Sequence, residues 1–189
     1  MKLLLPLLLV LACTTPHVRR PYDPEALHGV TLGIPAPADS RPTPGIGCGM
    51  LAQDLPLRAH KMLVGAFSDA GANATNASTG PWVLTVALRD ATMGPENERT
   101  RRTDKPVISR PPDAPQLDTP QQSWFNSGMG NVVVVLDATL ARDGAVVWRE
   151  TITGHAESAP CLQAVDKVHE ALGDAVDELR DRVIRVVRR

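Results

Sequence analysis

The sequence lacks the motifs that mark most enzymes and metal proteins. It has no Gly-x-Ser-x-Gly nucleophile motif, no Walker-type phosphate loop and no glycine fingerprint of a dinucleotide site. None of its five histidines stands in a His-x-x-x-His or His-Glu-x-x-His spacing, and there is no Cys-x-x-Cys pair. Acidic pairs such as Asp174 and Asp177 are routine on helix surfaces. We therefore expect no cofactor, no bound metal and no enzymatic activity.

An excess of one charge is also missing. The chain has 20 Lys and Arg against 21 Asp and Glu, a formal net charge of −1. Removing residues 1–12 would take one basic residue, Lys2, and leave 19 against 21. Nucleic-acid-binding domains ordinarily carry a basic patch or excess. We therefore expect no nucleic acid partner.

The N-terminal apolar run is too short to cross a membrane. Residues 3–11 follow the basic Lys2 and precede Ala12 and Cys13. A membrane-spanning helix needs about 20 apolar residues, whereas a basic start, a short apolar core and a small residue at the cut site are typical of an export signal. The pattern predicts a cleaved signal peptide over residues 1–12.

The four residues Val10-Leu11-Ala12-Cys13 resemble the lipobox of bacterial lipoproteins. The resemblance implies diacylglycerol on the Cys13 thiol, a palmitate-type acyl chain on its new amino group and cleavage before it. Three chains, each contributing about 0.8 kcal/mol per buried methylene, hold a protein firmly on a membrane. Thr14 resembles the outer-membrane sorting class, because Asp is the usual inner-membrane retention cue there. We expect a lipid anchor in the inner leaflet of the outer membrane, facing the periplasm; plain secretion and an uncleaved helix are the alternatives.

Only three cysteines are present, and lipidation of Cys13 leaves Cys48 and Cys161. A cysteine pair in an oxidising compartment indicates a disulfide. In the chain-entropy model, closing so long a loop stabilises a fold by up to ~4 kcal/mol. We predict a Cys48–Cys161 disulfide, with two separate thiols as the alternative.

Composition divides the remaining chain into a tether, one domain and an insertion. Residues 13–27 are rich in proline without an apolar period, which is typical of an extended, flexible tether. Residues 28–189 are long enough for one domain with a real core. Within it, residues 92–128 carry mixed charges and prolines, so we expect an irregular insertion. It is either a solvated connector or a contact for a lipid headgroup or partner.

Apolar periodicity predicts the secondary structure of the domain. Alternation indicates strands, and a stripe at helical spacing indicates helices. Asp54 is a candidate N-cap, Gly71 a candidate C-cap, and Gly144 a left-handed turn residue between two strands. The expected strands cover 30–34, 82–88, 132–140 and 146–156, with a weak strand or loop at 72–78, and the expected helices cover 54–70 and 162–187. The order favours an α+β fold with two layers: an antiparallel-rich sheet of four to five strands and two helices on one face.

This order of elements resembles YajG-type periplasmic lipoproteins. The resemblance covers residues 28–187 and includes the early strand leading to Asp39-x-Arg41, the helix closing at Gly71, the strand led by Trp82, the hairpin and the C-terminal helix. More loosely, the chain is similar to LptE and to lipoprotein accessories of lipid-trafficking ABC transporters. The resemblance implies an accessory or assembly factor with an envelope protein as partner; it leaves the oligomeric state unknown.

Two functions from different classes stay open. In the first, the anchored domain acts without catalysis and engages a membrane protein or lipid through its sheet edge or open sheet face. In the second, it binds a small amphiphile or lipid in a pocket between helices and sheet. A cavity of several hundred Å³ would favour the second. A sealed core would favour the first, and the residues that decide this are Leu63, Phe67, Val134, Val168 and Leu172.

Overall fold

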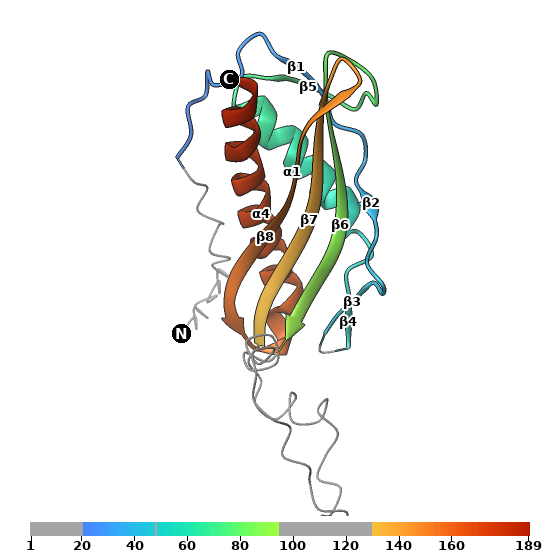
Figure 1. The fold of residues 1–189 in the computed structure, drawn as a ribbon. Coiled ribbons are helices and arrows are strands. Elements are labelled where there is room, and N and C mark those ends of the chain that lie inside the picture. The colour runs from blue at the N-terminus through green and yellow to red at the C-terminus, as the bar shows by residue number, and fades with distance from the viewer. Residues whose placement is uncertain (1–20, 48, 95–129) are drawn as a thin grey trace, which may run out of the picture.

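The computed structural model describes residues 21–47, 49–94 and 130–189, which form one sheet layer and one helix layer (Figure 1). The large sheet has six strands. Its strands are β1 (Thr31–Gly33), β2 (Ala38–Asp39), β5 (Asn73–Thr75), β6 (Trp82–Gly94), β7 (Gly130–Arg142) and β8 (Ala145–Ala159). The small sheet pairs β3 (Gly45–Gly47) with β4 (Met50–Leu51), and the helices are α1 (Leu55–Asp69), the 3₁₀ turn η2 (Cys161–Gln163) and α4 (Ala164–Val187).

The sheet is mixed, with the order β5-β1-β6-β7-β8 and β2 beside β6. The long strands β6, β7 and β8 are antiparallel neighbours, whereas β1 runs parallel to both β5 and β6. The parallel β1–β5 pairing has a direct cause: α1 lies in the connection from β1 to β5, and a crossover that contains a helix returns the chain in the same direction. The predicted α+β fold is confirmed, but with six strands and a parallel edge in place of four to five antiparallel-rich strands.

The hairpin between β7 and β8 closes through a two-residue turn. Asp143 and Gly144 have φ of 50° and 81°, the positive values that a tight type I′ turn requires at both central positions. The predicted left-handed Gly144 is confirmed, and Asp143 shares that conformation. At the end of α1, Gly71 has a φ of 88° and confirms the predicted C-cap region. Asp54 occupies the N-cap, but its side chain makes no capping hydrogen bond.

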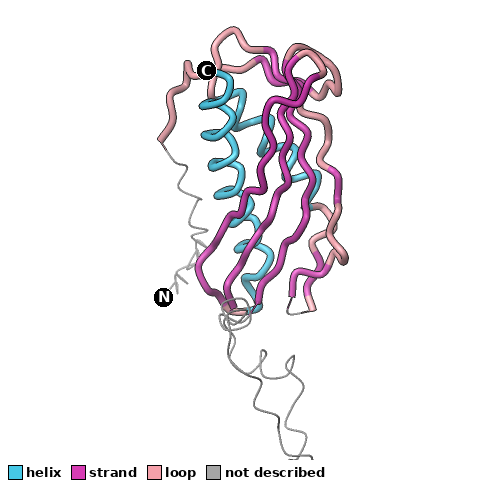
Figure 2. The backbone as a smooth tube through the Cα atoms, in the orientation of Figure 1, coloured by secondary structure: helices cyan, strands magenta, loops and turns pink. Residues whose placement is uncertain are grey.

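Both helices cover the same face of the sheet (Figure 2). Alternate residues of β7, from Val132 to Leu140, are buried beneath them, and the stripe of α4 from Val168 to Val183 packs against this face. Close packing depends on Gly154 in β8. A Cβ there would overlap the Ala171 carbonyl oxygen and stand 2.5 Å from the Ala175 nitrogen. The glycine therefore lets α4 lie directly beneath β8.

The structure differs from the sequence prediction at two boundaries. The expected tether 13–27 stops short of residue 27, because Leu27 is 1% exposed and belongs to the core. The expected insertion 92–128 starts too early, because residues 92–94 continue β6 and pair with β7. The alternation of buried and more exposed residues in β6 continues beyond a register shift between Leu88 and Asp90. The remainder of the expected insertion lies outside the described residues.

Candidate functional site

The sequence-predicted site residues are only partly within the described chain. Cys13, the expected lipid attachment, and Cys48, one half of the expected disulfide, lie outside it, as do the signal 1–12 and most of the tether. Cys161 opens η2 and its sulfur is disulfide-bonded. The pairing Cys48–Cys161 therefore stays a prediction.

The described residues offer no metal centre, since no group of three or more His, Cys, Asp or Glu among them could hold an ion. The three described ranges also contain no helix long and apolar enough to cross a membrane.

The space between helices and sheet is filled by side chains. The five residues that decide between a sealed core and a pocket are all 0% exposed and belong to one continuous apolar cluster; they are Leu63, Phe67, Val134, Val168 and Leu172. Protein interiors pack at the density of organic crystals, so such a cluster leaves little room for a ligand. This arrangement favours an interaction on the outer surface over an amphiphile pocket at these residues.

The opposite face of the sheet is open within the described part of the chain. Both helices lie on the other side, and the outward residues of β6, β7 and β8 alternate with the buried ones (Figures 1 and 2). Two valines, Val133 and Val135, lie in the middle strand and are partly exposed. Around them stand polar and charged side chains on the flanking strands. The face thus offers an apolar centre with a polar border, an arrangement typical of protein interaction surfaces.

A cross-strand network organises the polar part of this face. The Thr151 hydroxyl donates to an Asp137 carboxylate oxygen at 2.6 Å, and Arg89 lies 3.7 Å from the same oxygen. Arg149 Nε donates to the Thr139 hydroxyl at 3.2 Å. These groups line an open depression of about 610 Å³ together with Thr85, Ala87 and Glu150. The side chains are held in fixed directions, which lowers the entropy lost when a partner binds.

The segment after residue 21 is fastened to α4. The Tyr22 ring covers the Arg180 guanidinium, with 4.3 Å from Cζ to the ring centroid. Arg188 donates to the Asp23 carboxylate at 2.7 Å and to the Ala26 carbonyl at 3.0 Å. The hydrogen bond from Arg188 also holds the pKa of Asp23 below its usual value. Any anchor N-terminal to this segment is therefore tied to the C-terminal half of α4.

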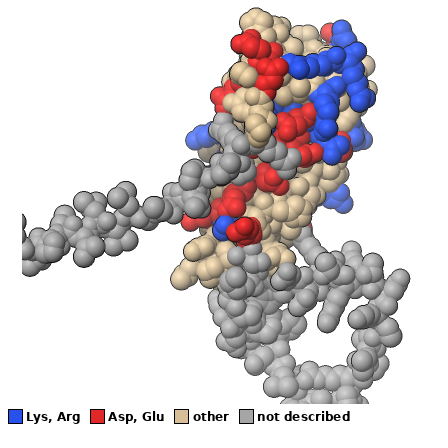
Figure 3. All heavy atoms as spheres, turned by 90° about the vertical axis from the view of Figure 1, so that its left-hand side faces the viewer, with Lys and Arg blue, Asp and Glu red and all other residues tan. Residues whose placement is uncertain are grey.

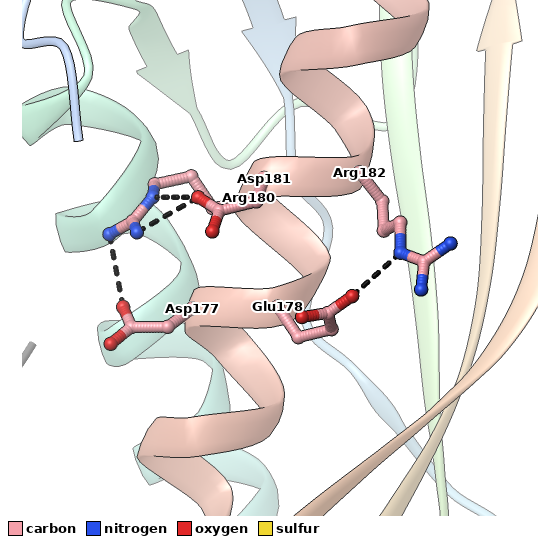
Figure 4. Close-up of polar contacts among 5 residues, drawn as sticks. All are labelled: Asp177, Glu178, Arg180, Asp181 and Arg182. Atoms are coloured by element: carbon pink, nitrogen blue, oxygen red, sulfur yellow. Dashed lines mark hydrogen bonds and ion pairs between the residues drawn. The ribbon is translucent and has the colours of Figure 1, made fainter. Parts of the chain in front are cut away.

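A buried ion pair joins Arg180 to Asp177 (Figure 4), and the Tyr22 ring lies over its guanidinium. Arg180 is 0% exposed; its Nη1 donates to Asp177 at 3.0 Å and its Nη2 to Asp181 at 3.0 Å. We expected Asp177 on the surface of this helix, and that expectation is wrong, because Asp177 is only 3% exposed. The spacing of three residues between Asp177 and Arg180 indicates a pair on one face of the helix. It does not indicate that Tyr22 covers this pair.

Asp39 and Arg41, which contribute to the family resemblance, have a structural role. Arg41 is buried and donates to both Asp39 carboxylate oxygens at 2.8 Å, and to the Ala52 carbonyl at 3.0 Å. The Arg41 hydrogen bond lowers the pKa of Asp39. The pair thus ties β2 to the chain just before α1.

Two histidines lie at the helix layer. His60 of α1 has Nε2 2.9 Å from the Ile34 carbonyl oxygen. His169 of α4 is partly buried, and its Nε2 has no hydrogen-bond partner among the described residues. Burial, with a smaller effect of Arg58, lowers the pKa of His169, although Asp54 and Asp166 act in the opposite direction.

The lowered pKa of His169 predicts a loss of stability in mild acid. The unfolded chain takes up a proton as the pH falls through the ordinary value of about 6.5, whereas the folded chain resists it. The free energy of unfolding should therefore decrease between pH 7.5 and pH 5.5, and His169→Gln should flatten that decrease. Urea unfolding of both proteins at the two pH values measures this. Equal pH dependence in the two proteins would contradict the assignment.

Comparison with known proteins shows the fold. No family model matches the chain, and no curated protein matches it. Among solved structures, a DUF330 protein from Xanthomonas campestris is similar at 18% identity and a TM-score of 0.57, over 90% of this chain and 91% of that chain. A PelC dodecamer from Paraburkholderia phytofirmans follows at 14% identity and 0.45, over 80% and 86%. A candidate lipoprotein from Caulobacter crescentus CB15 has 12% identity and 0.38, over 79% and 90%.

The first likeness establishes a shared fold over nearly the whole length of both chains. The other two are too distant to add to it. None of the three similarities specifically supports the resemblance to YajG-type lipoproteins or the one to LptE.

Proposed function

We propose that this chain is a non-enzymatic accessory or assembly protein of the bacterial envelope, and that its open sheet face binds an envelope protein, such as a component of a lipid-trafficking complex. The observation that carries the proposal is the contrast between the two sides of the sheet. The helix side is filled by one apolar cluster, whereas the outer side presents partly exposed valines and an oriented polar network.

The anchor belongs to the same proposal. Export and lipidation at Cys13 would place the domain on the periplasmic side of the outer membrane. Tyr22 lies nine positions after Cys13 (22 − 13), and a fully extended chain spans at most about 3.3–3.6 Å per residue, or roughly 30 Å here. Since Tyr22 is packed on α4, a lipid at Cys13 would hold the domain close to the bilayer. An oxidising periplasm also suits the proposed Cys48–Cys161 disulfide.

Photo-crosslinking in the native envelope tests this function. A photoreactive residue at Thr85 or Val135 lies on the open face, and one at Lys61 lies on an exposed position of α1 as the matched control. We expect one discrete adduct with the same envelope protein from both outer-face positions and none from Lys61. Cys13→Ser should move the protein into the soluble periplasmic fraction. Membrane-bound protein that gives no adduct at either outer-face position would contradict the proposed function.

A further inference from the structure

The last strand of the sheet is long and has one free side. β8 covers 15 residues, and among the described residues its only neighbour is β7. The free side of an edge strand carries backbone N–H and C=O groups that can pair with another strand.

One hydrogen bond fixes which amides face away from β7. The His155 N–H donates to the Asp174 carboxylate of α4 at 3.1 Å, so it is directed away from the β7 ladder. The register between β7 and β8 is uninterrupted from His155 back to Trp148. Because alternate residues of a strand direct both backbone groups to the same side, the outward groups are those of Thr153, Thr151 and Arg149.

The free edge is protected at one end only. The Asp174 carboxylate accepts the hydrogen bond of the His155 N–H, so this amide is not available to an added strand. Covering an edge strand in this way prevents unwanted strand pairing. From Arg149 to Thr153 there is no proline and no second strand among the described residues. This stretch offers three outward residues, each with one donor and one acceptor.

A second copy of this fold does not fit along this edge. Gly154 brings the α4 backbone directly beneath β8, so a paired copy would bring its own α4 beneath its own β8. Adjacent strands lie about 4.8 Å apart, whereas packed helices need about 8–10 Å between their axes. The two helices would collide. The edge accepts a strand that has no helix beneath it, such as an extended peptide segment.

Charge along the edge gives that segment a polarity. Arg149 is exposed at one end. Arg182 of α4 lies in the same region but is paired with Glu150 at 3.3 Å and with Glu178 at 2.6 Å, so it is the charge of Arg149 that an acidic residue of a partner would meet. The exposed Glu157 and the capping Asp174 stand at the other end. Figure 3 shows this side of the molecule: basic side chains gather on the right of its upper part, whereas acidic side chains lie at the upper left and also reach farther down.

We propose that the edge of β8 from Arg149 to Thr153 binds one extended segment of the partner protein as an added strand. The segment carries an acidic residue near Arg149 and a basic residue near Glu157. This inference rests on the proposed function, because it names the part of the partner that would be recognised. It differs from that function in its site, which is the strand edge and not the sheet face.

Synthetic peptides test the inference on the full chain. The probes are peptides of alternating Val and Thr with Asp at one end and Lys at the other, in both orders, and the measurement is fluorescence anisotropy. Thr151→Pro removes one outward donor, while Thr151→Val keeps it and also loses the hydroxyl. We expect Thr151→Pro to bind at least about fivefold more weakly than Thr151→Val, as the loss of one hydrogen bond implies.

Two further measurements make the test decisive. A probe N-methylated at alternate residues cannot donate to the edge and should lose binding, which tests the pairing even if Thr151→Pro fails to fold. Arg149→Glu combined with Glu157→Lys should reverse the preferred probe order. No binding of the unmethylated probes, or equal binding by the proline and valine variants, would overturn the inference. Adducts from Thr85 and Val135 alongside such a result would leave the proposed function standing.

Discussion

Gly154→Ala is expected to destabilise the fold by about 3 kcal/mol or more. The new Cβ would overlap the Ala171 carbonyl oxygen and lie 2.5 Å from the Ala175 nitrogen and 2.8 Å from the Ala175 Cβ. Overpacking ordinarily costs about 1–3 kcal/mol because side chains can shift. Here most of the opposing atoms belong to helix backbone, so α4 itself would have to move away from β8. The cost should therefore reach the upper end of that range or exceed it.

Gly65→Ala is the matched control for this experiment. Gly65 lies within α1, and a Cβ at that position would meet no atom within 4 Å. Alanine in a helix interior is favoured over glycine by about 0.8–1 kcal/mol, so this variant should be slightly more stable than the native protein. Urea unfolding followed by circular dichroism measures both. If Gly154→Ala unfolded at the same urea concentration as the native protein, the close approach of α4 to β8 would be wrong.

Gly154 also shows where sequence reasoning reaches its limit. Alternation along residues 146–156 predicts the strand, and the stripe of α4 predicts the helix, because both patterns are local. The contact between them depends on how closely two distant elements approach. A glycine inside a strand pattern can mark a bulge, a bend or a close backbone approach, and only the fold selects among these. The hairpin was predictable and the packing distance was not.

The same difference between local patterns and contacts of distant elements explains which parts of the sheet order and of the open sheet face could be predicted. The sequence predicts β6, β7 and β8 well because each has a long alternating pattern. The parallel edge is built from β1, β2 and β5, which have two or three residues each; β1 and β2 pair with β6, and β5 pairs with β1. The open face follows from the alternation once both helices are known to pack on one side. The outward direction of the β8 amides does not follow from the alternation. It is shown by the hydrogen bond between His155 and Asp174, which lie 19 positions apart in the sequence.

Arg180→Ala is the second variant with a large expected effect, about 3–5 kcal/mol. Arg180 is fully buried, and its guanidinium contacts Asp177, Asp181 and the Tyr22 ring. Removing it would leave the buried Asp177 carboxylate without its Arg180 partner and empty the space beneath Tyr22. Breaking one side of a buried ion pair costs this much because a charge is left in an apolar environment. The loss would also release Tyr22 from α4, so protease cleavage after Tyr22 should become faster.

A double variant separates the buried charge from the packing. Arg180→Met with Asp177→Ala removes both charges and keeps an apolar side chain beneath Tyr22, and buried ion pairs can often be replaced by apolar residues at little cost. We therefore expect the double variant to be more stable than Arg180→Ala, although it has one more substitution. Arg182→Ala is the surface control on the same helix: Arg182 is 42% exposed and pairs with Glu178 at 2.6 Å, and such pairs contribute about 0–1 kcal/mol. Urea unfolding of all three variants decides the matter. Equal losses for Arg180→Ala and Arg182→Ala would mean that the pair beneath Tyr22 is no more important than a surface contact, and that the segment from Tyr22 to Leu27 is held by its other contacts, those of Arg188 and of the buried Leu27.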